Sequence, residues 1–196
     1  MSNNTPESNE QLPYGPDAIW APWRLPYLED LGASENPPGK AKTTGAPKTE
    51  SASFLADYWN HPEHDARNHV IVRDEIGMIL LNKYPYSNGH LLVALGEARP
   101  ALLDYDESQR AALWRLVDRA ADLMQRTLEP QGINIGVNQG RAAGAGVPSH
   151  LHVHLVPRWG GDTNFMSVVG QVRVIPASLE AMYARYCRSL NLKGSS

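Results

Sequence analysis

Three histidines alternate with aliphatic residues in the segment His150-Leu151-His152-Val153-His154-Leu155-Val156, and this pattern restricts the fold and function of the chain more than any other. Successive side chains of an extended strand point to opposite faces. The pattern therefore predicts a strand over residues 150–156 with its histidines on one face and its aliphatic residues on the other. In a chain of 196 residues with 7 histidines, chance produces this spacing on the order of once in a hundred.

Three roles for the histidine face can be compared. Three imidazoles in a row add little to a core. Two histidines at i and i+2 can chelate a metal ion, but the outer pair is roughly 13 Å apart at Cα, so all three do not easily converge on one zinc. A neutral imidazole, with a reference pKa of about 6.5, can attack phosphorus directly when a strand carbonyl holds its other ring nitrogen. We favour the nucleophile and keep the metal site as an alternative.

A glycine-rich loop leads into this strand. Residues 138–146 read Asn-Gln-Gly-Arg-Ala-Ala-Gly-Ala-Gly. Backbone N–H groups of such a loop can bind phosphoryl oxygens. Next to a nucleophilic histidine, the loop indicates a phosphate-bearing substrate.

The rest of the chain from residue 54 indicates an α+β domain. Residues 70–72, 77–81 and 90–95 read as strands, the last two joined as a hairpin by the turn-rich loop 83–89. Residues 133–137 alternate as a strand with one buried face. A turn at 160–162 and a short strand near 172–175 follow. These elements predict an antiparallel sheet with helices on one side.

Two amphipathic helices are predicted. Asp104 and Glu107 form a candidate capping box for the first, and Pro130 ends it. Its apolar stripe contains Leu113, Leu116, Val117, Ala120, Met124 and Leu128. A closing helix is indicated by Leu179, Met182, Tyr183, Tyr186 and Leu190.

Residues 1–53 are expected to form a largely flexible N-terminal extension, because 1–17 are polar and 32–53 contain almost no large apolar side chain. The aromatic segment 18–28 between them is expected to be ordered and to dock on its own subunit or on a neighbour. Eighteen Lys and Arg against 21 Asp and Glu give a charge of −3, which offers no case for a nucleic-acid or acidic-membrane partner. A single cysteine, no secretory leader and no apolar stretch of bilayer length predict a cytoplasmic protein.

The histidine strand resembles the signature of the histidine triad (HIT) family. Asn82-Lys83-Tyr84-Pro85-Tyr86-Ser87-Asn88-Gly89-His90 is similar to the family's upstream hairpin, and Asn138-x-Gly140 to a further step of its pattern. Residues 157–165 and the aromatic segment resemble the branch of the fragile-histidine-triad hydrolases and bacterial diadenosine tetraphosphate phosphorylases. The resemblance implies a HIT domain over residues 54–196, with a five-stranded antiparallel sheet, two main helices and a homodimer.

The resemblance also assigns roles to residues. His152 is implied as the nucleophile, His150 as the residue that positions it, and His154 and His90 as supports for the phosphate and the nucleophile. The implied nucleotide contacts are Asn82 with the ribose, Asn138 and N–H groups near Gly146 with the phosphates, and Trp159 with the base, where a structural role for Trp159 is an equal alternative.

The implied activity is cleavage of a dinucleoside polyphosphate at the α-phosphorus, by hydrolysis or phosphorolysis, through a nucleotidyl-histidine. Nucleoside phosphoramidate hydrolysis and a non-catalytic nucleotide sensor are the alternatives. Relatives with a Cys-x-x-Cys zinc site differ from this chain, where residues 53–57 hold no cysteine, so no metal or cofactor held by protein ligands is expected. Any Mg²⁺ is expected to arrive with the nucleotide.

Overall fold

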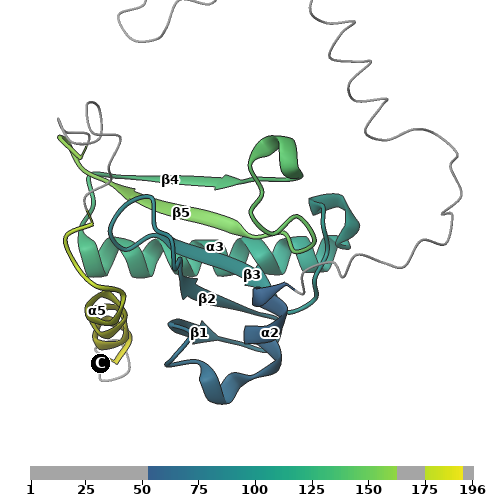
Figure 1. The fold of residues 1–196 in the computed structure, drawn as a ribbon, viewed down its shortest axis with the longest axis horizontal. Helices are drawn as coiled ribbons and strands as arrows, with labels where there is room; N and C mark the ends of the chain where they lie inside the picture. The colour runs from purple at the N-terminus through teal and green to yellow at the C-terminus, as the bar shows by residue number, and fades with distance from the viewer. Residues whose placement is uncertain (1–52, 163–174, 192–196) are drawn as a thin grey trace, which may run out of the picture. The chain divides into compact units, whose positions relative to one another are not determined.

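The computed structural model describes residues 53–162 and 175–191. The predicted N-terminal extension up to residue 52, its aromatic segment 18–28 and residues 172–174 of the predicted short strand lie outside the described residues. Within them the fold is a five-stranded antiparallel sheet with three α-helices, as Figure 1 shows. The predicted α+β class and antiparallel sheet are therefore confirmed.

The sheet has the strand order β1-β2-β3-β5-β4, and every neighbouring pair is antiparallel. Its strands are β1 Val70–Arg73, β2 Gly77–Leu81, β3 Leu91–Leu95, β4 Gly132–Val137 and β5 Val153–Arg158. The helices are α2 Phe54–Asn60, α3 Glu107–Leu128 and α5 Leu179–Asn191, with 3₁₀ turns η2 Pro62–His64, η3 Leu102–Asp104 and η4 Arg141–Ala143. None of the three α-helices is long and apolar enough to cross a bilayer.

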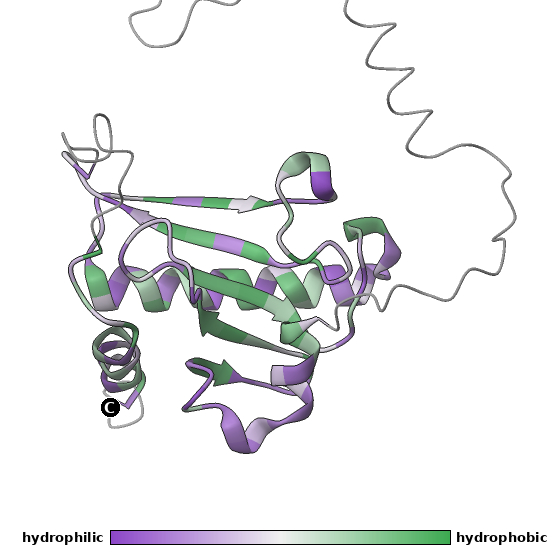
Figure 2. Ribbon diagram, in the orientation of Figure 1, coloured by the Kyte–Doolittle hydropathy of each residue, from purple (hydrophilic) through white to green (hydrophobic). Residues whose placement is uncertain are grey.

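Strands β2 and β3 are buried on both faces, which explains why their sequences are continuously apolar rather than alternating. Figure 2 shows them as the most uniformly hydrophobic strands. Ile79 and Val93 face the main core under α3 and α5. Leu80 and Leu92 face a smaller cluster closed by Leu55 of α2.

Helix α2 was not predicted from the sequence. Phe54, Leu55, Tyr58 and Trp59 recur at helical spacing, and Ser53 caps the helix by accepting a hydrogen bond from the Ala56 N–H at 3.3 Å. The signal is short, because only seven residues are helical. Leu55 is fully buried, so tertiary packing stabilises this short helix.

The start of α3 corrects the predicted capping box. Asp106, not Asp104, caps the helix: its Oδ1 accepts from the Gln109 N–H at 2.8 Å, and Gln109 Oε1 accepts from the Asp106 N–H at 3.0 Å. Asp104 instead closes the preceding turn η3, where its carboxylate accepts from the Ala101 N–H. Asp104 and Asp106 both fit the capping-box motif, but Asp104 already bonds within turn η3.

The histidine segment also differs from its prediction at one end. Strand β5 begins at Val153 rather than at His150, so only His154 of the three histidines lies within the strand. The physical reason is that pairing with both neighbours stops at Val153: the β3–β5 pairing ends at Val93, and β4 itself ends at Val137. Before that point the Leu151 N–H bonds instead to the carbonyl of Arg99.

Strand β4 lies at the edge of the sheet, beside β5. The alternation of its sequence predicts a buried face, but in this single chain Ile135 is 45% exposed. Ile133 and Val137, on the same face, are partly buried against the main core. The predicted burial is therefore incomplete within one chain.

Candidate active site

The nucleophile candidate is held by the backbone just before it. Nδ1 of His152 lies 2.9 Å from the carbonyl oxygen of His150. Because a carbonyl only accepts hydrogen bonds, Nδ1 carries the proton and Nε2 keeps its lone pair. The acceptor is thus in the same chain segment, not in a neighbouring strand. This tautomer is the one that can attack phosphorus through Nε2.

A second pair of histidines lies beside it. The backbone N–H of Tyr86 donates to Nδ1 of His90 at 3.1 Å, so His90 must carry its proton on Nε2. That N–H faces Nδ1 of His154 at 3.0 Å. His154 therefore carries its own proton on Nε2 and presents an N–H donor. The rings of His152 and His154 are adjacent, with centroids 4.9 Å apart.

Burial keeps this cluster neutral. The pKa of His152 is lowered because burial penalises the charged imidazolium, against a smaller raising effect of its bond to the His150 carbonyl. Burial and the proximity of His152 lower the pKa of His154 to about 4. The pKa of His150 is lowered by burial as well. Burial therefore favours the uncharged form of His150, His152 and His154 at pH 7.

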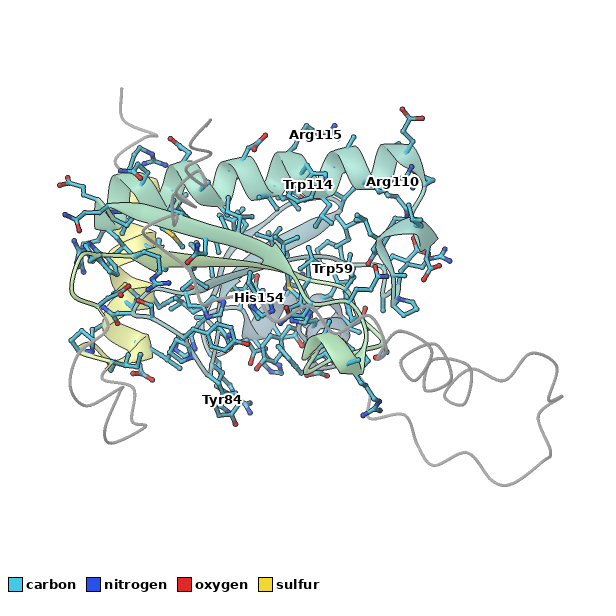
Figure 3. The ribbon with its side chains drawn as sticks, turned by 90° about the horizontal axis from the view of Figure 1, so that it is seen from above. Trp59, Tyr84, Arg110, Trp114, Arg115 and His154 are labelled. Atoms are coloured by element: carbon cyan, nitrogen blue, oxygen red, sulfur yellow. The ribbon has the colours of Figure 1, made fainter. Side chains whose placement is uncertain are left out.

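His152 has little access to solvent. It is 5% exposed and His150 is fully buried, whereas His154 is half-buried. In Figure 3 His154 lies on the side of the sheet away from α3, the side from which Tyr84 projects. His154 is therefore the more accessible of the two adjacent rings.

The loop after β2 positions His90. Asn82 Nδ2 donates to Nδ1 of His90 at 3.2 Å, and Asn82 Oδ1 accepts from the Tyr84 N–H at 2.9 Å. Asn82 thus orders its own loop, a role that sequence reasoning missed although an Asx turn before Pro85 is a recognisable signal. Tyr86 was missed too: its ring stacks on that of His154 at 17°, with centroids 5.7 Å apart.

The glycine loop begins beside His152. Val137 pairs with Val153 at the end of β4, so Asn138, which follows Val137, and His152, which precedes Val153, lie on adjacent segments of the chain. Within the loop the N–H groups of Gly144 and Ala145 bond to Arg141 and Gly140. Within residues 53–162 and 175–191, the Gly146 N–H does not bond to a backbone carbonyl.

Trp159 packs, partly buried, against the main core cluster. Its neighbour Arg158 forms an ion pair with Asp162 at 2.6 Å that closes the predicted turn, where the Asp162 N–H bonds to the Trp159 carbonyl. The position supports the structural role of Trp159, and its contact with a base stays a prediction.

A cavity of about 350 Å³ adjoins the cluster, because Asn82 and His90 both line it. Pro85, Pro176 and Met182 form other parts of its walls. The size is that of a small-molecule pocket. No group of three or more His, Cys, Asp or Glu within residues 53–162 and 175–191 is arranged to hold a metal ion.

This fold and this cluster define a class of α+β proteins that present neutral imidazoles beside a glycine loop at one face of an antiparallel sheet. Residues 63–161 match the family model described as the HIT domain. The chain belongs to the HIT domain, or histidine triad, family.

Individual relatives agree. A Mycobacterium tuberculosis protein named AP-4-A phosphorylase is 34% identical over 162 residues, 82% of this chain and 77% of its own length. A Schizosaccharomyces pombe protein named bis(5'-nucleosyl)-tetraphosphatase [asymmetrical] is 32% identical over 93 residues, 47% of this chain and 50% of its own. The structure of a Zn-bound histidine triad family protein from Mycobacterium smegmatis is similar with a TM-score of 0.60 and 26% identity, covering 74% of this chain and 98% of that one.

Proposed function

We propose that this protein cleaves dinucleoside polyphosphates at the α-phosphorus through a nucleotidyl intermediate on His152. The bond between His152 Nδ1 and the His150 carbonyl carries the proposal, because it leaves the Nε2 lone pair as the attacking group. Attack forms a P–N bond and expels the remaining nucleotide. The carbonyl then stabilises the charge that develops on the imidazole.

The neighbouring groups fit the other steps. The Nε2–H of His154, fixed through His90, is a donor for a phosphoryl oxygen. Asn138, which follows the last β4 residue paired with β5, is a further donor beside His152, and the Gly146 N–H is proposed as another. The cavity lined by Asn82 and His90, with Pro85 and Met182 in its walls, is proposed to hold a nucleoside.

We further propose inorganic phosphate as the preferred acceptor. The relative named AP-4-A phosphorylase matches 82% of this chain, whereas the tetraphosphatase matches 47%. Phosphate would attack the nucleotidyl-histidine, break the P–N bond and release a nucleoside diphosphate. Water as the acceptor would release a monophosphate instead.

A homodimer is proposed as the working form, with cytoplasmic location as predicted from the sequence. Strand β4 ends the sheet order within the described residues, and its Ile135 is 45% exposed. Helix α3, which packs on β5, exposes 43% of Trp114. An edge strand with an apolar side chain is suited to pairing with a second copy.

Product analysis with diadenosine tetraphosphate tests the function. We expect ADP and ATP with inorganic phosphate and little turnover without it; AMP and ATP without phosphate would support hydrolysis and contradict the proposed acceptor. His152→Ala is expected to lower turnover by about 10⁴-fold or more and to keep nucleotide binding. His154→Ala, which removes one donor, is expected to have a smaller effect on the order of 10²-fold.

Retained turnover by His152→Ala would overturn the nucleophile. A nucleoside phosphoramidate assayed in parallel separates the alternative enzyme class: faster cleavage of the phosphoramidate would contradict the proposed substrate. Tight nucleotide binding without turnover of either compound would identify a sensor and exclude the proposed activity.

A further inference from the structure

Ser53 contacts the histidine cluster from a distant part of the sequence. Its Oγ lies 2.9 Å from Nδ1 of His150, and 97 residues separate the two. Both side chains are buried. A buried hydrogen bond between a helix cap and the first histidine of the cluster connects α2 to the site.

The direction of this bond follows from its neighbours. Nε2 of His150 lies 2.8 Å from the carbonyl oxygen of Leu95, so Nε2 carries the proton and Nδ1 has the lone pair. The hydroxyl of Ser53 must therefore donate to Nδ1. Its oxygen accepts from the Ala56 N–H at the same time. Only a group that both donates and accepts can fill this position.

The backbone of His150 connects the Ser53 contact to His152. The ring of His150 is fixed at both nitrogens, by Ser53 and by Leu95, and its carbonyl oxygen accepts from Nδ1 of His152. Rotation of the ring would shift the residue whose carbonyl sets the tautomer of His152. Ser53 thus contacts the residue whose carbonyl binds the proposed nucleophile.

Helix α2 is anchored well enough to place a hydroxyl accurately. Arg73 of β1 donates to the carbonyl oxygens of Tyr58 and Trp59 near the end of α2, at 2.9 and 3.0 Å. Its guanidinium also pairs with Asp65 and lies 5.0 Å from the centre of the Trp59 ring. Ser53 therefore precedes a helix whose last residues are tied to β1.

We propose that Ser53 is a positioning residue for the nucleophile: by donating to His150 Nδ1 it holds the His150 carbonyl that keeps the proton of His152 on Nδ1. This inference rests on the proposed function for its consequence in turnover. Its structural step, the fixed tautomer of two histidines, does not depend on any activity.

Three substitutions separate the hydroxyl from the helix cap. Ser53→Gly removes the hydroxyl and keeps most of the capping, since glycine is nearly as good an N-cap as serine. Ser53→Thr keeps both. Asp106→Gly is the matched control, because it removes the cap of α3 without a histidine partner. We expect kcat/KM to fall on the order of tenfold in Ser53→Gly, and to stay near wild type in Ser53→Thr and Asp106→Gly.

The ring ¹⁵N chemical shifts of His150 and His152 provide the second measurement. Wild type is expected to show His150 protonated at Nε2 and His152 at Nδ1. In Ser53→Gly we expect both populations to become mixed, with recovery in Ser53→Thr. Unmoved His152 shifts in Ser53→Gly, or an unchanged kcat/KM beside moved shifts, would overturn the positioning role.

The two proposals fail differently. If His152→Ala retained turnover, the proposed function would fall, while the shift of the His150 and His152 tautomers in Ser53→Gly remained measurable. If the tautomers stayed fixed while His152→Ala was inactive, Ser53 would be a helix cap only and the nucleophile would stand.

Discussion

Each imidazole of the cluster receives its proton position from a different neighbour. A backbone carbonyl fixes His152, a backbone N–H fixes His90, and His90 in turn fixes His154. Main-chain groups cannot change protonation, so the pattern of donors and acceptors is set by the fold and not by pH. A fall in pH can add a second proton to an imidazole ring, and burial opposes that protonation at His152 and His154.

The pH dependence of kcat/KM follows from these shifts. kcat/KM reports ionisations of the free enzyme, and the attacking form of His152 is the neutral one. Since its pKa lies below the ordinary value of 6.5, the neutral fraction stays high as pH falls from 8 to 6.5. His154, with a pKa of about 4, keeps its N–H donor over the same range.

We therefore expect kcat/KM to keep more than half of its pH 8 value at pH 6.5, with an acid limb centred below 6.5. The profile is measured with diadenosine tetraphosphate at constant phosphate and ionic strength. A limb centred at or above 6.5 would mean that the nucleophile is not desolvated in the free enzyme, against the burial described here.

The elements that carry the site were predictable where their signals are local. The strands β1 to β3 follow from short apolar runs, the stripe of α3 and the helix α5 follow from helical periodicity, and the histidines were found by their spacing. The start of β5 was not predictable, because it depends on where pairing with β3 and β4 stops. Nor was the contact between Ser53 and His150, which joins residues 97 positions apart.

A tight turn delivers His90 to the cluster. Gly89 has φ +84°, and its carbonyl accepts from the Tyr186 hydroxyl at 2.8 Å. A Cβ added here would lie 2.4 Å from Cδ1 of Leu128. Backbone conformation and space thus both favour glycine, and they couple the loop after β2 to α3 and α5.

Gly89→Ala is expected to lower the free energy of unfolding by about 2–4 kcal/mol, from the left-handed backbone and the overpacking together. Urea denaturation measures it. Gly132→Ala is the control, because an added Cβ there meets only Arg158 Cβ, at 4.0 Å; we expect a change within about 0.5 kcal/mol. Equal effects at the two positions would show that the turn at Gly89 adapts without cost.

At the scale of the whole molecule, the two edges of the described sheet, β1 and β4, differ in what covers them. The β1 side is flanked by α5, which contacts both β1 and α3. At the other side β4 is bound only to β5 among the described strands, and its Ile135 is nearly half exposed. An edge of this kind favours aggregation unless it is covered, and a second copy pairing at β4 would cover it.

Ile135→Lys tests that pairing. A charged side chain on an edge strand opposes strand addition, so the variant is expected to elute as a monomer where wild type has twice the chain mass of 21.6 kDa. Light scattering after size exclusion gives the mass. Ile76→Lys, at a similarly exposed isoleucine between β1 and β2, should leave the dimer intact. A dimer that survives Ile135→Lys would place the dimer interface elsewhere. A monomeric wild type would contradict the proposed dimer, and in either case the exposed side chain of Ile135 would need another explanation.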